Sequence, residues 1–401
     1  MESSTSPARS LSPASGRSEN DQGRWRRENA DPPTALMIII KMKEDYFDKA
    51  MEYGSLRRAL NKCCRNVRWK DSVVGYELHA PQHTHNLMNA IESGTYELSP
   101  YQHFIIYEPK KRDIVATRIR DRQVQMALCD GGLYRDFVEH FIYDNCACQK
   151  GKGTDFAIKR TKVHLMQYYH EYGNEGWVLQ GDVKHFFPST RHDVAKMAVA
   201  KRISDPKAKQ FVFDVIDSFD GDVGIGLGSQ ISQLVELSVL DDMDHLIKEQ
   251  LGVRHYIRYM DDFRLFHHSR DYLVYCLGII EKHLNGIHLE LNKKTCVHPL
   301  QQGVKFIQWW FSLTDTGRIV MKMNNKKVNR EKQRLKKLLY KEARGEIAEG
   351  TAQNSLQSWK ANALRGKGDT YRQRKSVDTY FQHVKEAIYG NDAGALTKNG
   401  T

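Results

Sequence analysis

Two β-prone runs that meet at a pair of adjacent aspartates constrain the fold of this 401-residue chain more than any other feature. Residues 254–259 lead into Asp261 and Asp262, and residues 263–266 follow them. Two neighbouring carboxylates cannot both be buried without partners, because each unpaired buried charge costs several kcal/mol. The pattern therefore predicts a tight turn between two strands. Such a turn can simply hold two solvated acids, but its apolar flanks favour a rigid site for hard divalent cations.

A third acid, Asp182, ends another short β-prone run, residues 177–182. The plain structural interpretation of an acid here is a helix cap. Asp182 stands too early in the chain to cap the helical segment near Ser189 and Thr190. Three carboxylates at neighbouring strand ends can hold two Mg²⁺ ions about 3.5–4 Å apart, with Mn²⁺ as a substitute. That arrangement stabilises the attacking and leaving oxygens in nucleotidyl transfer.

Around these acids the apolar pattern changes repeatedly between helix and strand. Helices are predicted over residues 45–64, 85–94, 122–139, 161–172, 191–202, 229–249, 272–284 and 325–344. Strands are predicted over residues 103–107, 113–117, 177–182, 254–266 as two runs, 287–291 and 304–313. The first two strands flank a basic turn and predict a hairpin. The alternation as a whole predicts an α+β fold with a split-βαβ sheet.

Positive charge is concentrated in the last quarter of the chain. The sequence has 61 Lys and Arg against 49 Asp and Glu, a formal charge of +12, and residues 301–401 alone hold 20 against 9. Nine of these 20 cations fall within residues 325–344. A charge run is usually a solvated helix face, but one of this density favours an anionic partner such as nucleic acid.

No segment of the sequence predicts a membrane partner. The apolar run at residues 37–40 is far shorter than the ~20 residues that span a bilayer. The seven cysteines contain no C-x-x-C pair, which favours a reducing, cytoplasmic setting. Residues 1–36, rich in Ser, Pro and Arg, predict a disordered tail.

Six blocks, in order, resemble bacterial reverse transcriptases of the group II intron, retron, diversity-generating and defence-associated kinds. They lie at residues 110–125, 141–153, 181–189, 226–233, 258–262 and 289–295. The resemblance implies a right-hand polymerase, with fingers over 37–176, a palm over 177–302, and a primer-grip strand and helical thumb over 303–401. It also implies RNA-directed DNA synthesis from a template RNA, a primer or cDNA and dNTPs, in a retroelement or an antiviral defence system.

The same resemblance implies roles for single residues in the reaction. Asp182, Asp261 and Asp262 match the metal-binding acids, with the Val183 backbone beside them, and Lys294 matches the lysine that acts on departing pyrophosphate. The positions that match the dNTP site are Lys110, Arg112, Phe187 and Gln230, of which Phe187 corresponds to the aromatic that excludes a ribose 2′-OH. Leu227 stands where many relatives have Gln.

Primer and template contacts are implied for a further set of residues, namely Tyr259, Met260, Trp309, Lys326, Lys327, Arg330, Arg334 and Lys337. The plainer interpretations are core packing for the aromatic rings and solvent exposure for the cations. Trp309 and Trp310 are adjacent in a predicted strand, so one of the two is expected to be buried.

Two other functions fit the same pattern. One is a maturase-like protein that stabilises a cognate structured non-coding RNA, although the presence of all three acids favours catalysis. The other is template-independent or protein-primed nucleotide addition. Omitting the template RNA from an extension assay separates this last function from templated synthesis.

Overall fold

A computed structural model describes residues 45–107 and 111–396, with side chains up to residue 390. The strands are β1 (Gln102–Ile106), β2 (Arg112–Ala116), β3 (Trp177–Asp182), β4 (His255–Tyr259), β5 (Asp262–His267), β6 (Cys296–Pro299), β7 (Val304–Phe306), β8 (Trp309–Leu313) and β9 (Ile319–Met323). The predicted tail, residues 1–36, and Lys110 lie outside the described residues.

Helices make up most of the described chain. Before β3 they are α3 (Tyr46–Met51), α4 (Tyr53–Cys63), α5 (Asp71–Leu78), α6 (Ala80–Glu92), α7 (Ile119–Leu128), α8 (Tyr134–Val138) and α9 (Thr154–Tyr172). Between β3 and β4 they are α10 (Phe186–Ser189), α11 (His192–Ala200), α12 (Pro206–Asp217), α13 (Gln230–Val239) and α14 (Asp241–His245). The remaining helices are α15 (Arg270–Gly286), α16 (Asn325–Ala343), α17 (Thr351–Ala363) and α18 (Tyr371–Leu396).

The central sheet has four strands in the order β4-β5-β3-β6, and every neighbouring pair is antiparallel. A helical crossover joins β3 to β4, and β5 is inserted between these two strands. Helix α15 joins β5 to β6, and β3 is inserted between those two. This is the split-βαβ arrangement that the sequence predicted.

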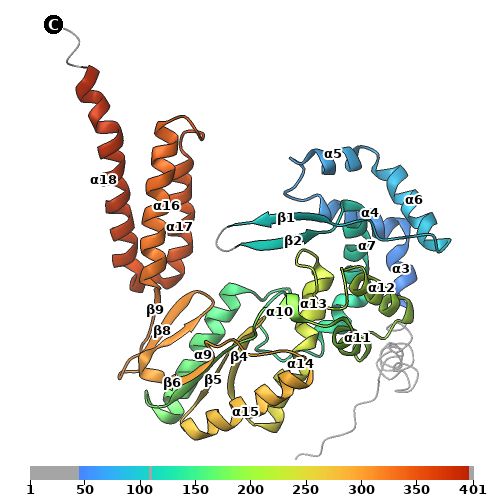
Figure 1. Ribbon diagram of the computed structural model, residues 1–401, viewed down its shortest axis with the longest axis horizontal. Helices are drawn as coiled ribbons and strands as arrows, with labels where there is room; N and C mark the ends of the chain where they lie inside the picture. The colour runs from blue at the N-terminus through green and yellow to red at the C-terminus, as the bar shows by residue number, and fades with distance from the viewer. Residues whose placement is uncertain (1–44, 108–110, 397–401) are drawn as a thin grey trace, which may run out of the picture.

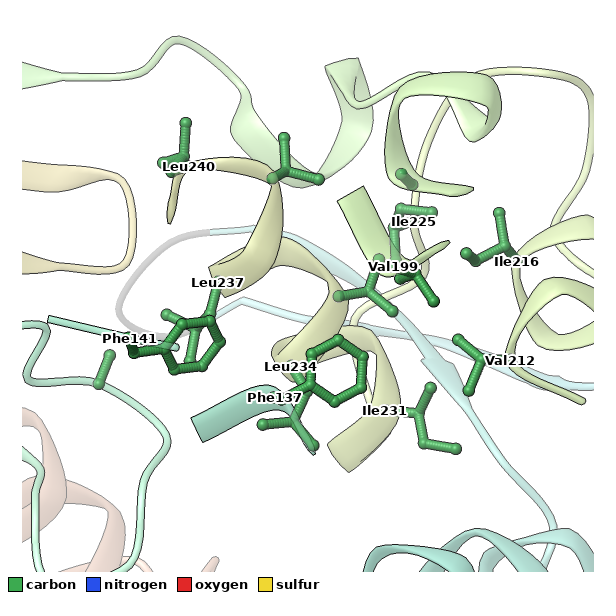
Figure 2. Packing of buried hydrophobic residues seen from close by; sticks show 14 of the residues in the cluster. Phe137, Phe141, Val199, Val212, Ile216, Ile225, Ile231, Leu234, Leu237 and Leu240 are labelled. Carbon is green, nitrogen blue, oxygen red and sulfur yellow. The ribbon is translucent and has the colours of Figure 1, made fainter. Parts of the chain in front are cut away.

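Helix α13 lies at the centre of the main hydrophobic core. Ile231, Leu234 and Leu237 of this helix point into a cluster with Phe137 and Val199, as Figure 2 shows. Its start is set by Ser229, whose Oγ accepts a hydrogen bond from the Ser232 N–H. This helix also contacts strand β4, because the Leu237 carbonyl accepts a hydrogen bond from Arg258 Nη2 at 3.3 Å.

A second core joins the central sheet to the C-terminal part of the chain. It contains Val178 and Phe266 of the central sheet together with residues of the β7-β8-β9 sheet and of α16 to α18. In Figure 1 these three helices rise from the β8–β9 region, and the β1–β2 hairpin projects toward them from the side of α4 and α7. Because this core crosses residue 303, the predicted division into palm and thumb there stays a prediction.

Two of the predicted strands differ from the structure. The run 287–291 is not a strand: α15 ends at Gly286, His288 has a φ of 58°, and β6 begins only at Cys296. The run 304–313 forms two strands, because Ile307 and Gln308 both have positive φ and close a two-residue turn between β7 and β8.

Three predicted helices are also interrupted. The predicted helix 45–64 divides into α3 and α4 at Glu52, because the ψ of 147° at this residue is not helical. The predicted helix 229–249 divides into α13 and α14, followed by a π-helical turn at Leu246–Gln250, because Leu240 has non-helical dihedral angles of −95° and 3°. The predicted helix 122–139 is interrupted by a π-helical turn at Cys129–Leu133, where Gly131 and Gly132 allow close approach of Ala50 and Tyr46. Across the described residues, no helix combines the length and apolar character that a bilayer crossing needs.

Candidate active site at the β4–β5 turn

The three predicted acids meet at one end of the central sheet. Asp182, the last residue of β3, is the direct partner of Asp262, the first residue of β5, and residues paired in this way project from the same face. Asp261 lies in the turn between β4 and β5, and its carbonyl accepts a hydrogen bond from the Val183 N–H at 3.1 Å. The register therefore brings together acids that are 79 positions apart in the chain, from 182 to 261.

A buried ion pair supports the turn from behind. Arg258 and Asp244 are both fully buried, and Arg258 contacts the carboxylate through Nε at 2.7 Å and through Nη2 at 2.5 Å. The remaining Nη1 donates to the Met260 carbonyl at 3.0 Å. Met260 has a φ of 57°, which is uncommon for a non-glycine residue. The guanidinium thus holds the strained peptide that positions Asp261.

Electrostatics at the turn favour the binding of a cation. Burial, and next the negative charge of Asp182, raise the pKa of Asp261 to about 6, while Arg112 of β2 acts to lower it. Burial and a neighbouring like charge both disfavour the ionised form of a carboxyl group, so its pKa rises in such a site. The same electrostatic effect shows that Arg112, predicted to hold a triphosphate, lies near this turn.

Asp262 differs from the other two acids because protein groups already contact its carboxylate. Arg264 Nη1 lies 2.5 Å from Asp262 Oδ1, and the Ile307 N–H also acts to lower the pKa of this side chain. Burial raises the pKa of Asp262, and Arg264 acts to lower it. The sequence pattern did not single out Arg264 or Ile307, although an Arg at a buried strand position two residues after an acid was a usable signal.

The donors suit Mg²⁺ by type, since carboxylate and carbonyl oxygens are its usual ligands. Within the described part of the chain, however, no group of three or more His, Cys, Asp or Glu side chains is arranged to hold a metal ion. Binding by all three aspartates and by the Val183 backbone stays a prediction. Of the three acids, only Asp262 forms an ion pair with a described residue, which leaves Asp182 and Asp261 as the pair for a cation.

The loop that carries Lys294 is attached to the backbone around Asp182. Asn292 N–H donates to the Asp182 carbonyl at 2.7 Å, and Lys184 N–H donates to the Glu290 carbonyl at 2.8 Å. Lys294 itself is exposed, two residues after Asn292. The structure therefore places this lysine on a loop next to the acids, where its predicted role stays open to test.

Phe187 lines a cavity of about 270 Å³ between the β1–β2 hairpin and the glycine-rich loop before α13. Val115, Gly226 and Leu227 line the same cavity, and the Val115 N–H donates to the Leu227 carbonyl at 3.0 Å. A Cβ at Gly228 would meet the Val115 carbonyl oxygen at 2.5 Å, so only glycine allows this approach. Gln230 begins α13 just beyond the loop and is partly exposed.

Trp309 does not offer a surface for primer stacking. Its side chain is 3% exposed and belongs to the second core, because the alternation along β8 turns Trp309, Phe311 and Leu313 inward. The neighbouring Trp310 is partly exposed and packs against Gly303. The predicted contact of Trp309 with nucleic acid is therefore corrected, and the expectation that one of the two tryptophans is buried is confirmed.

Most of the predicted duplex-binding cations form one stripe on α16. At 100° per residue, five exposed cations lie within roughly a quarter of a turn of one another, opposite the buried Val328, Leu335 and Leu339. These five, which we call the basic stripe, are Lys326, Arg330, Arg334, Lys337 and Lys341. Lys327 lies off the stripe and donates to Gln308 Oε1 of the β7–β8 turn at 2.9 Å.

One further buried acid lies near the turn and was not predicted. Glu236 of α13 is fully buried and accepts a hydrogen bond from Thr190 Oγ1 at 2.9 Å. Burial, with the nearby Asp261, raises the pKa of Glu236 well above its ordinary value. A Glu within the apolar pattern of a helix gives no sequence signal that distinguishes it from an exposed residue.

Comparison with known proteins gives weak similarities. No family model matches the chain. Protein YkfC of Escherichia coli (strain K12) is 25% identical over 176 residues, which cover 41% of this chain and 45% of YkfC. The chain thus aligns with less than half the length of this curated relative.

Solved telomerase structures resemble the fold at low sequence identity. Candida albicans telomerase in complex with a TWJ fragment of telomeric RNA matches with a TM-score of 0.43 and 13% identity, over 71% of this chain and 56% of that one. Apo telomerase of Candida tropicalis gives a TM-score of 0.45 and 11% identity, over 77% and 67%. Similarities at this level assign no family, and the functional argument rests on the site itself.

Proposed function

We propose that this chain is an RNA-directed DNA polymerase. One observation supports this more than any other: the β3–β5 register pairs Asp182 with Asp262, beside a turn that carries Asp261. Acids gathered from separate strands at a sheet end suit phosphoryl transfer, whose catalysis is mainly positioning and charge stabilisation. The ordered blocks around these acids, which resemble those of reverse transcriptases, direct the proposal to templated DNA synthesis.

The chain's own residues have distinct parts in this reaction. Asp182 and Asp261 would hold the divalent cations, which when bound stabilise charge on the attacking and leaving oxygens. Arg112, together with Lys110, would bind the triphosphate, because guanidinium groups pair well with phosphate oxygens. The primer 3′-OH would then face the α-phosphate in line. Lys294 is the proposed proton donor or counter-charge for pyrophosphate.

We propose that the cavity wall selects the sugar of the nucleotide and that α16 binds the template–primer duplex. Phe187 would contact the sugar of the incoming nucleotide and exclude a 2′-OH, since it lines the cavity below the β1–β2 hairpin. The basic stripe would follow the phosphates of the template–primer duplex. Met260 and Tyr259, at the turn, are the proposed neighbours of the primer terminus.

The direct test is a primer-extension assay with the full chain, a defined RNA template, an annealed DNA primer, four dNTPs and Mg²⁺. Templated synthesis predicts products that end at the template 5′ end and whose sequence follows the template. Parallel reactions omit the template, omit the primer, or replace dNTPs by NTPs. No extension in any reaction, with intact RNA binding, would overturn the proposal in favour of a maturase-like RNA-binding protein.

Extension without template would point instead to template-independent or protein-primed addition. The biological setting proposed from the resemblance, a retroelement or a defence system, needs a separate measurement. Sequencing of nucleic acid that co-purifies with the protein would identify a template RNA or a cognate structured RNA. Recovery of cellular RNA without enrichment of any one species would contradict a dedicated template.

A further inference from the structure

We propose that Arg264 is a positioning residue that attaches the β4–β5 turn, with its acids, to the β7–β8 hairpin. Arg264 is two residues after Asp262 on β5, so both side chains project from the same face of the sheet. Its side chain is 6% exposed. A buried guanidinium is tolerated only where its donors are satisfied, so its partners define what it connects.

Its partners lie on both sides of the junction between the two sheets. On the side of the acids, Nη1 donates to Asp262 Oδ1 at 2.5 Å and to the Gly181 carbonyl at 3.3 Å. On the side of the hairpin, Nε donates to the Lys305 carbonyl at 2.8 Å, and Nη2 donates to the same oxygen. The guanidinium also lies 5.1 Å from the centroid of the Phe306 ring.

The hairpin turn makes a reciprocal contact with the acid. The Ile307 N–H acts to lower the pKa of Asp262, so it faces this carboxylate. Ile307 and Gln308 have φ values of 42° and 77°, a left-handed pair without glycine, which is a strained conformation for side-chain-bearing residues. The surrounding contacts must hold this turn in place, and Arg264 and Asp262 provide two of them.

The connection continues to the basic helix. Lys327 of α16 donates to Gln308 Oε1 at 2.9 Å, so the same turn contacts the acid on one side and α16 on the other. A lysine at position 264 would keep the charge, but it has one nitrogen and cannot serve Asp262 and the Lys305 carbonyl with a planar fork. Resting on the proposed function, Arg264 fixes the primer terminus relative to the acids through this hairpin, without contacting substrate.

The test compares Arg264→Lys with the control Arg254→Met. Arg254 directly precedes β4, is exposed, and pairs with Glu171 of α9. Hydrogen exchange of residues 304–310 is measured in the protein without substrates, together with thermal unfolding. In Arg264→Lys we expect exchange in this segment to be about 10-fold faster, with β3 and β5 unchanged. The control should exchange as the wild type does.

Single-turnover extension gives the second readout. Arg264→Lys should lower the rate constant by about 10- to 100-fold, because the primer terminus is misplaced. The amplitude of the single-turnover reaction and the template–primer Kd should stay within about 2-fold of the wild-type values, whereas a folding defect would lower the amplitude. Wild-type exchange in 304–310, or faster exchange throughout β3 and β5 with a lower amplitude, would overturn the proposal.

A second variant covers the case in which Arg264→Lys does not fold. The double variant Asp262→Asn/Arg264→Met leaves no buried charge unpaired, and it should also exchange faster in residues 304–310. Wild-type exchange in this variant would contradict the proposal. Hydrogen exchange needs no enzymatic activity. If the wild type extends no primer, the polymerase function is refuted, but the exchange measurement still tests the role of Arg264.

Discussion

Arg258 and Asp244 form an ion pair from which solvent is excluded, and Arg258 also binds the carbonyl of Met260 in the acid turn. Removing one partner leaves a buried charge uncompensated. We therefore expect Asp244→Asn to lower the free energy of unfolding by about 3–5 kcal/mol in denaturant titrations. Arg254→Met, which breaks the exposed pair with Glu171, should cost no more than about 1 kcal/mol. Equal losses in the two variants would show that Asp244 has no special structural role.

The basic stripe predicts a salt-dependent affinity that depends on helix face. Arg330→Gln/Lys337→Gln removes two stripe cations, and Lys332→Gln/Lys336→Gln removes two from another face of α16. In fluorescence anisotropy with an RNA–DNA duplex, the stripe variant should reduce the slope of log K against log salt by about 2. The matched variant should leave the slope close to that of the wild type. An equal reduction of the slope in both variants would show that the number of charges, and not their placement, governs binding.

Phe187 predicts the sugar specificity of the proposed reaction. Shortening this side chain opens the cavity that it shares with Val115 and Leu227. Phe187→Ala should therefore lower the preference for dNTP over NTP, measured as a ratio of kcat/KM values, by about 10-fold or more. Met197→Ala, at an exposed position on α11, is the control and should not change the ratio. An unchanged preference in Phe187→Ala would make Phe187 a packing residue only.

Asp144 predicts a defined pH dependence of stability. Burial acts to raise its pKa, but His164 and Arg160 outweigh this effect and lower the pKa to about 2. A depressed pKa stabilises the folded state above the unfolded value near 4, and this contribution is lost as pH falls through about 2. Asp144→Asn should thus cost about 2 kcal/mol at pH 7, and the difference from wild type should shrink below pH 4.

Urea titrations of both proteins between pH 7 and pH 2.5 measure this difference. Asp155→Asn, whose side chain is 74% exposed beside Arg365, serves as the control. A stability difference for Asp144→Asn that stays constant across the whole pH range would show that the lost contacts do not depend on the ionised carboxylate.

Local patterns predicted the part of the site that lies within single elements. Strand β3, the β4–β5 turn, the β1–β2 hairpin and α16 were each expected close to their observed bounds, because strict alternation or helical periodicity marks them. The alternation of strands and helices also predicted a split-βαβ arrangement, but not the order of the strands in the sheet. These local patterns alone predict Asp182, Asp261 and Asp262 at strand ends.

Features that depend on tertiary contacts were not predictable in the same way. The β7–β8 turn lacks glycine, so nothing in the sequence separated residues 304–313 into two strands. The apolar alternation at 287–291 resembled a strand, yet Leu289 is buried in the turn after α15. Arg264 reaches a carbonyl 41 positions away, at Lys305, and no local pattern records such a contact.

The most direct test of the proposed catalytic site is the single-turnover rate of dNTP incorporation by Asp261→Asn on an RNA template. Asp271→Asn, at a 96% exposed position on α15, is the matched control. We expect Asp261→Asn to lower the rate by about 1,000-fold or more, with the template–primer Kd within about 2-fold of the wild type. The control should retain the wild-type rate. A rate for Asp261→Asn within about 10-fold of the wild type would contradict catalysis at the β4–β5 turn.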